Sequence, residues 1–294
     1  MKNDIKISLI LCTLGRTNEV KSFLTHANEF TFDNFEIIIA DQNEDDRIVK
    51  LLDDLDKRRF SVVHIKTPVG LSRSRNIALK YTKGDIIAFP DDDCLYESNT
   101  LEKVYKFFEI NSEYDVLIAK WCNTTDDGVQ PHENKKSHKI VSDIEIFSFM
   151  SSEIFVRKKV FERIGSFDEK LGLGSGTIFR GGEDYDFLIR CINKSLQLYY
   201  SSEIIIKHPW KGIDLSSDSE RIEKYLNDIV YAGASDFYVM KKNFPFTKTF
   251  RIIVNNIGMM FFLLFKMDKI GFKMHFSRIK GFVKGLFFIL KHEN

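Results

Sequence analysis

The amino-acid sequence predicts an α/β protein in which a mostly parallel sheet is flanked by helices. Short apolar runs alternate with segments of helical periodicity in the N-terminal third, and one run, residues 86–89, leads directly into Asp91, Asp92 and Asp93. The composition, 44% hydrophobic and 29% charged with five prolines, is typical of a globular protein. Because 294 residues can bury about three quarters of the unfolded surface, we expect a full core, in one large domain or two modest ones.

The first strand is predicted at residues 7–12, which are apolar and are followed by a turn at 13–16. Apolar side chains then recur with helical spacing from Val20 to Ala27. The same pattern repeats, with strands at 35–40, 61–65 and 86–89 and helices at 48–55 and from Ser72 to Gly84. Strands that alternate with helices indicate a parallel sheet with right-handed crossovers.

The second half of the chain predicts a less regular series of elements. These are a helix at 100–110, a strand at 116–120, a polar loop at 122–139, an extended segment at 147–155, a helix at 158–164, a glycine-rich connection at 172–182, a helix opening at Glu183, and a last strand at 204–207 ending at His208. Ser217 and Glu220 have the spacing of a capping box and predict a helix of about twenty residues.

Charge is distributed unevenly along the chain. Residues 245–294 hold nine Lys and Arg against two acidic residues, a net charge of +7. Their longest uncharged stretch, Ile252 to Phe265, would extend about 21 Å as a helix, less than the roughly 30 Å of bilayer hydrocarbon. We therefore expect one or two interfacial helices that bind anionic lipid. The alternative is a helical pair packed on the rest of the chain or on a second subunit. Nucleic-acid binding is disfavoured because aliphatic residues separate the lysines.

The four cysteines and the N-terminus bear on the cellular compartment. Cys12, Cys94, Cys122 and Cys191 lie far apart without metal-ligand spacing, which is typical of reduced thiols in a cytosolic protein, three of them expected in the core. The N-terminus leads straight into the first strand without an apolar segment of signal-peptide length. The sequence thus predicts a cytoplasmic protein held peripherally on the inner face of the cell membrane.

The acidic triplet is the first candidate site. Three adjacent carboxylates are too costly to bury unless something neutralises them, so a divalent cation and a phosphate are expected there. In an extended segment Asp91 and Asp93 would point the same way and share the cation, while Asp92 would not. His208, at another strand end, is a candidate third metal ligand. The alternatives are a solvated acidic turn and a surface histidine.

Other polar residues follow strand ends at the same predicted edge of the sheet, where open α/β folds bind ligands. They are Thr13, Arg16, Asp41, Arg73, Arg75 and Asn76. Each taken singly could be an ordinary turn residue, but together they predict a nucleotide pocket, with arginines near a helix N-terminus facing phosphate.

Glu183 and Asp184 follow Gly181 and Gly182 at the start of a predicted helix. A carboxylate at a helix N-terminus stays ionised and can accept a proton from a hydroxyl nucleophile. The alternative is an ordinary acidic N-cap.

These motifs together resemble the family 2 glycosyltransferases, over roughly residues 6–210. The correspondence runs, in order, through Cys12–Arg16, Asp41, Gly70–Asn76, Phe89–Asp93, Phe155–Arg157, Ile164–Glu169 and Gly182–Phe187. The resemblance implies a GT-A fold and inversion at the anomeric carbon. It implies nucleotide contacts by Thr13, Arg16 and Asp41, a DxD-type site for Mg²⁺ or Mn²⁺ and diphosphate at 91–93, and Asp184 as the catalytic base.

The chain departs from the family's pattern at two points near the nucleotide. Leu14 stands where the family often has an aromatic residue, and Gln42-Asn43 replaces the commoner Asp-Gly. His208 matches a metal ligand of some relatives. The identity of the nucleotide is therefore left open by the resemblance.

The resemblance implies a metal-dependent hexosyltransferase that moves a sugar from a UDP-linked or other nucleoside diphosphate donor to a glycan or lipid-linked glycan. Surface-polysaccharide assembly in bacteria is the expected pathway, and a homo-oligomer is possible. The alternatives are a sugar nucleotidyltransferase and a non-catalytic membrane scaffold. The expected domains are a catalytic domain at 1–215, with a donor half at 1–105 and an acceptor half at 106–215, a helical connection at 216–244 and basic helices at 245–294. The acidic residues at 91–93 and at 183–184 are expected to line one cleft.

Overall fold

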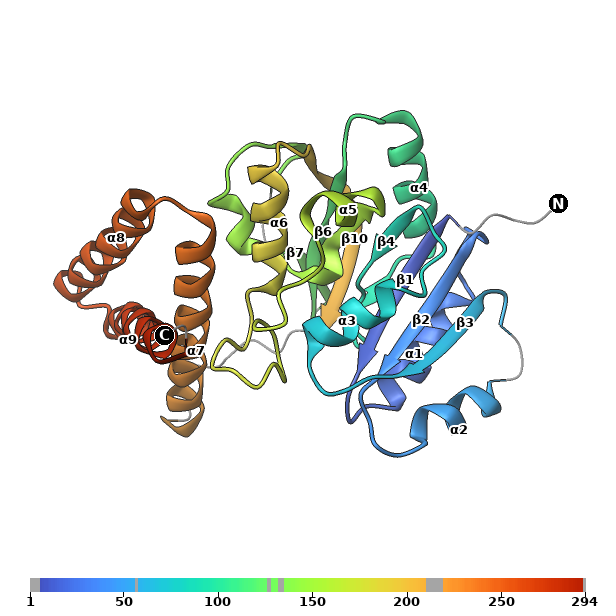
Figure 1. Cartoon of the computed structure of the whole chain (residues 1–294), viewed down its shortest axis with the longest axis horizontal. Coiled ribbons are helices and arrows are strands. Elements are labelled where there is room, and N and C mark those ends of the chain that lie inside the picture. Colours follow the sequence, from blue (N-terminus) through green and yellow to red (C-terminus); the bar gives the residue numbers. More distant parts are fainter. Residues whose placement is uncertain (1–5, 56–57, 126–127, 132–134, 210–218, 293–294) are drawn as a thin grey trace. The chain divides into compact units, whose positions relative to one another are not determined.

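A computed structural model describes residues 6–55, 58–125, 128–131, 135–209 and 219–292 (Figure 1). The chain divides into two compact units. The first, here the sheet unit, comprises residues 1–167 and 187–211, and the second, the helical unit, comprises residues 168–186 and 212–294.

The N-terminal half of the sheet unit is a parallel sheet with strand order β3-β2-β1-β4. The strands are β1 (Ile7–Thr13), β2 (Phe35–Asp41), β3 (Ser61–Lys66) and β4 (Ile86–Ala88), and the helices between them are α1 (Asn18–Ala27), α2 (Arg47–Asp54) and α3 (Leu71–Leu79). Every residue of β2 is buried, as expected for a strand covered on both faces. The predicted parallel sheet and its alternation with helices are confirmed.

Beyond β4 the sheet becomes mixed, and its order continues β4-β9-β6-β10-β5. These strands are β5 (Leu95–Tyr96), β6 (Val116–Thr125), β9 (Ile154–Arg157) and β10 (Leu198–Pro209), with helices α4 (Thr100–Ile110), α5 (Lys159–Ile164) and α6 (Glu183–Asn193). β9 runs antiparallel to both β4 and β6, whereas β10 runs parallel to β6. The parallel pair β6 and β10 places the end of β10, including His208, beside Asn123 of β6.

Three predicted segments of the sheet unit need correction. The expected loop at 122–139 contains the end of β6, β7 (Gly128–Pro131) and β8 (His138–Ile140), because β6 turns back in an antiparallel pair with β7. The expected extended segment at 147–155 consists mainly of two 3₁₀ turns, Glu145–Ser148 and Ser151–Glu153. The last strand begins at Leu198 rather than 204, and His208 lies within it rather than after it.

The helical unit contains α7 (Ser219–Asn243), α8 (Phe246–Phe265) and α9 (Lys269–His292), drawn in orange to red in Figure 1. α9 packs closely along α7, because glycines let the two backbones approach: a Cβ added at Gly281 would lie 2.3 Å from the Val230 carbonyl oxygen. α8 packs on α9 and contacts α7 little. The predicted capping box at Ser217 lies outside the described residues.

Residues 168–186 pack with these helices, although the sequence analysis places them in the catalytic domain. Lys242 of α7 lies 2.7 Å from Asp168 and 3.0 Å from Asp186, and the ring of Phe179 stacks on Tyr238 at 4.6 Å. α7 therefore has a packing role of its own and does more than connect the predicted domains at 1–215 and 245–294.

Candidate active site

The acidic triplet forms a turn after β4, and this turn is held by residues from the end of β1. Thr13 Oγ1 donates a hydrogen bond of 2.8 Å to Asp92. Arg16 Nη1 donates to Asp92 at 2.5 Å and to Asp93 at 2.7 Å. Strand alternation predicted that Asp92 points away from Asp91 and Asp93. A turn has no such alternation, so Asp92 and Asp93 share the guanidinium group of Arg16.

The three carboxylates have different environments. Asp92 is buried, and burial raises its pKa although Thr13 and Arg16 act in the opposite direction. Asp93 lies 3.1 Å from His208 Nε2, and this hydrogen bond lowers the pKa of Asp93 and raises that of His208. Asp91 is half-buried and lies 3.8 Å from Arg75 Nη2. The end of β10 is thus brought to the triplet, as the sequence predicted for His208.

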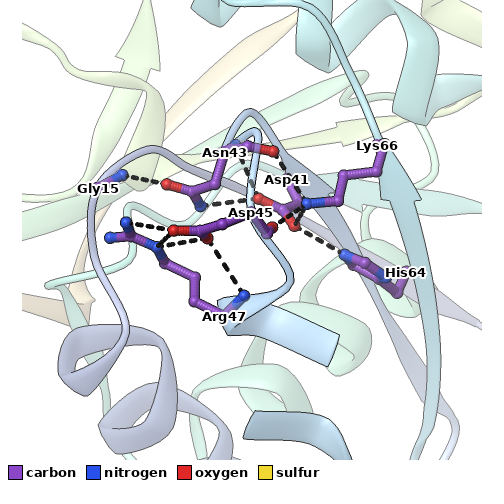
Figure 2. A network of polar contacts seen from close by, with 7 residues as sticks. All are labelled: Gly15, Asp41, Asn43, Asp45, Arg47, His64 and Lys66. Atoms are coloured by element: carbon purple, nitrogen blue, oxygen red, sulfur yellow. Dashed lines mark hydrogen bonds and ion pairs between the residues drawn. The ribbon is translucent and has the colours of Figure 1, made fainter. Parts of the chain in front are cut away.

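Asp41, at the end of β2, is fully buried and is surrounded by donors (Figure 2). Its Oδ1 accepts hydrogen bonds from the backbone and side-chain nitrogens of Asn43, at 2.9 and 2.7 Å. Its Oδ2 lies 3.0 Å from both His64 Nε2 and Lys66 Nζ. Burial alone would raise the pKa of Asp41, but these hydrogen bonds outweigh burial and the pKa is lowered. A contact between Asp41 and a nucleotide stays a prediction.

His64 and Lys66 are residues of this edge that were not predicted from the sequence, and Asn43 was noted only as a departure from the family's pattern. Asn43 Oδ1 accepts a hydrogen bond of 2.6 Å from the backbone of Gly15, so it links the end of β2 to the turn that carries Arg16. His64 and Lys66 alternate on β3, and the register pairs Lys66 with Asp41. The sequence did contain a signal for this contact. Two basic residues two positions apart lie on the same face of a strand, and the neighbouring strand ends in an acidic residue.

Arg75 and Asn76, two of the three predicted site residues on α3, contact other residues of the protein. Arg75 is 2% exposed, donates a hydrogen bond of 2.6 Å to Ser151 and lies over the ring of Phe167. The Asn76 side chain donates to the carbonyl oxygen of Phe167 and accepts from its backbone nitrogen, both at 2.9 Å. Arg73 is half-buried in the first turn of the helix. Their contacts with a nucleotide stay predictions.

Glu183 and Asp184 open α6, as predicted, and belong to the helical unit. Glu183 is 5% exposed and Asp186 is fully buried, where Asn243 donates to it at 2.8 Å. Asp184 is the one acid of this first turn that is only half-buried. It is therefore the acid of the turn that a substrate can reach most readily, which agrees with its predicted role without testing it.

The side chains near the triplet decide which metal ion could bind there. Over the described residues, no group of three or more His, Cys, Asp or Glu is arranged to hold a metal ion. Asp93 and His208 nevertheless offer a carboxylate and an imidazole side by side. His208 Nδ1 is buried and has no hydrogen-bond partner among the residues that the structure describes. One carboxylate and one imidazole suit a transition-metal cation such as Mn²⁺, with water or phosphate oxygens in its other positions.

The chain is similar to known glycosyltransferases in sequence and in fold. An uncharacterized glycosyltransferase of Haemophilus influenzae is 29% identical over 196 residues, covering 64% of this chain and 62% of the relative, so the chain spans less than two thirds of that protein. The crystal structure of S. aureus TarS 1-349 in complex with UDP-GlcNAc matches with a TM-score of 0.56 at 20% identity, over 78% of this chain and 66% of TarS.

A second solved structure extends the likeness over nearly the whole chain. The mannosyltransferase PcManGT from Pyrobaculum calidifontis, in complex with GDP-Man and Mn²⁺, matches with a TM-score of 0.58 at 11% identity, over 96% of this chain and 87% of that protein. These similarities establish a GT-A-like fold. The model of glycosyl transferase family 2 matches residues 8–165, more than half of the sequence. The chain therefore belongs to glycosyl transferase family 2.

Proposed function

We propose that this protein transfers a sugar from a nucleoside diphosphate sugar, UDP-linked, to a hydroxyl group of a glycan or lipid-linked glycan, with inversion at the anomeric carbon. The observation that carries the proposal is the meeting of Thr13, Arg16, Asp92, Asp93 and His208 at the carboxyl edge of a family 2 sheet. The complex of TarS with UDP-GlcNAc supports a UDP-linked donor. Assembly of a bacterial surface polysaccharide is the pathway we propose.

In this proposal the diphosphate of the donor lies at the acidic turn. Arg16 supplies positive charge there, and Asp93 with His208 would hold a divalent cation. When bound, such a cation offsets the negative charge that develops on the leaving diphosphate. The complex of PcManGT with GDP-Man and Mn²⁺ supports a metal in this role.

Asp184 is proposed as the catalytic base. Its carboxylate takes the proton from the acceptor hydroxyl while the hydroxyl oxygen forms a bond to the anomeric carbon. The bond between that carbon and the diphosphate oxygen breaks, and the nucleoside diphosphate leaves with the electron pair. The half-buried position of Asp184, between the buried acids Glu183 and Asp186, supports this assignment.

Asp184→Asn tests the base. We expect this variant to bind UDP as the parent does and to lose about 100- to 10,000-fold in transfer rate, the usual contribution of a general base. Asp53→Asn, which changes an exposed acid on α2, is the matched control and should keep full activity. Retained turnover in Asp184→Asn would reject it as the base.

Asp93→Ala tests the metal site, by calorimetric titration of UDP with and without Mn²⁺. We expect the parent to bind UDP more tightly with Mn²⁺ and the variant to lose this difference. Unchanged metal dependence in the variant would count against Asp93 as a ligand. Release of pyrophosphate instead of UDP during turnover would identify a sugar nucleotidyltransferase, and the absence of UDP binding to the parent would favour a non-catalytic scaffold.

A further inference from the structure

The helical unit has an apolar surface that its own helices do not cover. On α8 the exposed side chains Phe250, Val254, Phe261 and Phe265 are 45 to 83% accessible. They are spaced by four and seven residues, so they form one stripe along the helix, which we call the outer face of α8. Three aromatic rings in such a stripe are more than a single helix normally exposes to water.

Another side of α8 is the one that packs within the unit. Thr249 is buried and donates to the Met240 carbonyl oxygen of α7, and Ile253, Met260 and Leu263 are partly buried. Leu263 lies opposite the outer face, and Thr249, Ile253 and Met260 lie on one flank of it. The outer face of α8 is therefore not the side that packs on α9, and it stays exposed in the helical unit.

Basic residues lie at both ends of the outer face. Lys248 and Arg251 are in the first two turns of α8, and Lys266, Lys269 and Lys273 follow its C-terminus, the last three all exposed. Residues 245–294 carry a net charge of +7. An apolar stripe with cationic ends complements the surface of an anionic bilayer, whose acyl chains take the rings and whose headgroups take the lysines.

The same contacts decide how α8 would lie in a membrane. Among the described helices, α8 alone is long and apolar enough to cross a bilayer. The sequence-based length of about 21 Å was too short because it counted only the uncharged residues 252–265 and not the whole helix, Phe246–Phe265. However, α9 packs on α8 directly after a short turn and carries Lys273, Arg278, Lys280 and Lys284. A spanning α8 would draw these charges into the hydrocarbon, at a cost of roughly 3 kcal/mol each at the centre.

We propose that the outer face of α8 binds the interface of an anionic membrane, with the helix axis lying in the plane of the surface. The partner is the lipid surface itself, recognised by apolar burial and by charge. This attachment is separate from sugar transfer and does not depend on the proposed donor or base.

Sedimentation of the full-length protein with lipid vesicles tests the proposal. One set of vesicles is pure phosphatidylcholine and the other contains about a third phosphatidylglycerol. We expect binding to the anionic vesicles that weakens with salt, because the lysines contribute through screened electrostatics. The double variant Phe250→Ser, Phe261→Ser should bind about 100-fold more weakly, about tenfold for each ring. The control Ile110→Ser, Val141→Ser removes two apolar residues of the sheet unit that are even more exposed, at 80 and 78%, and should bind as the parent does.

Charge is tested in the same assay. Lys266→Glu, Lys269→Glu, Lys273→Glu should abolish the preference for anionic vesicles, whereas Lys21→Glu, Lys50→Glu, Lys80→Glu, on exposed positions of the sheet unit, should not. Circular dichroism and melting of each variant check that the fold is kept. Loss of binding in both lysine variants would show attraction by net charge only and would overturn the assignment of the surface.

Two other outcomes would overturn the proposal. If protein bound to anionic vesicles resists extraction with alkaline carbonate, α8 spans the bilayer instead of lying on it. If the parent binds no vesicles but forms a dimer that Phe250→Ser, Phe261→Ser converts to a monomer, the outer face belongs to an interface with a second copy.

Discussion

Lys242 of α7 holds two acids of the segment that carries the proposed base. Its Nζ lies 2.7 Å from Asp168 and 3.0 Å from Asp186. Asp186 is fully buried and has a second donor in Asn243, and Asp168 has a second donor in Tyr238 at 2.9 Å. Lys242→Met keeps the apolar stem and removes the charge, so each acid keeps one of these two donors.

The expected cost lies between the limits for exposed and buried ion pairs. Exposed pairs contribute about 0 to 1 kcal/mol, and removing one partner of a fully buried pair costs about 3 to 5 kcal/mol. The Lys242 side chain is one third exposed while Asp186 is fully buried. We therefore expect Lys242→Met to lower the free energy of unfolding by about 1 to 3 kcal/mol at pH 7.

The loss should depend on pH in one direction. Burial would raise the pKa of Asp168, but the hydrogen bond from Lys242 and other donors lower it below its ordinary value of 3.8. A group whose folded pKa is lowered stabilises the fold above its unfolded pKa and loses this contribution as pH falls through the folded pKa. The difference between parent and variant should thus be constant from pH 7 to 5 and shrink below 3.8.

Urea denaturation followed by circular dichroism, repeated over this pH range, measures the difference. Lys224→Met, an exposed lysine on the same helix, is the matched control and should change stability by less than about 0.5 kcal/mol. Equal stability of Lys242→Met and the parent at pH 7 would refute a stabilising role for the contacts of Lys242 with Asp168 and Asp186. A difference that grew as the pH fell would refute the assignment to Asp168.

Two further substitutions test other contacts. Gly281→Ala should destabilise the protein by about 1 to 3 kcal/mol, because its Cβ would lie 2.3 Å from the Val230 carbonyl oxygen, whereas Gly258→Ala, in an open and exposed part of α8, should stabilise it by up to about 1 kcal/mol. Thermal melting compares them, and equal effects would contradict the close packing of α7 and α9. Asn43→Ala should raise the KM for the donor sugar more than it lowers kcat, because it removes the hydrogen bond that holds the Gly15 backbone in the turn carrying Arg16. Steady-state kinetics with the donor concentration varied measures both constants. A change in kcat alone would contradict this prediction.

The sequence predicted the parallel half of the fold well because each of its strands is an apolar run followed by a helix. β2 is buried along its whole length and so reads as a continuous apolar run. β9 was harder to place, since nothing in Ile154–Arg157 indicates that it lies antiparallel between β4 and β6. The β6–β7 pair lies in a polar stretch without the apolar pattern of a buried strand, so the prediction of a loop at 122–139 was wrong there.

For the site, the sequence identified the edge of the sheet but not the contacts along it. Strand ends predicted that Thr13, Arg16, Asp92 and Asp93 would lie together, and the structure joins them by hydrogen bonds. The sequence could not predict that hydrogen-bond donors would enclose Asp41. These donors reach Asp41 because of the register of β2 against β3. A sequence determines such a register only where polar and apolar residues alternate along both strands.

Deletion of the C-terminal helices would be a poor test of membrane binding, because these helices also contact the segment that carries Asp184. Deleting residues 245–294 removes Arg278, which donates to Asp236 at 2.6 and 2.8 Å, and Asp236 also accepts from Tyr185, the residue after Asp184. A deleted protein that lost both membrane binding and activity would not distinguish these two causes. Arg278→Met should slow metal-dependent hydrolysis of UDP-sugars while most vesicle binding is kept, because the outer face of α8 is untouched. Phe250→Ser, Phe261→Ser should do the reverse, and parallel loss of both properties in either variant would contradict the separation of attachment from chemistry.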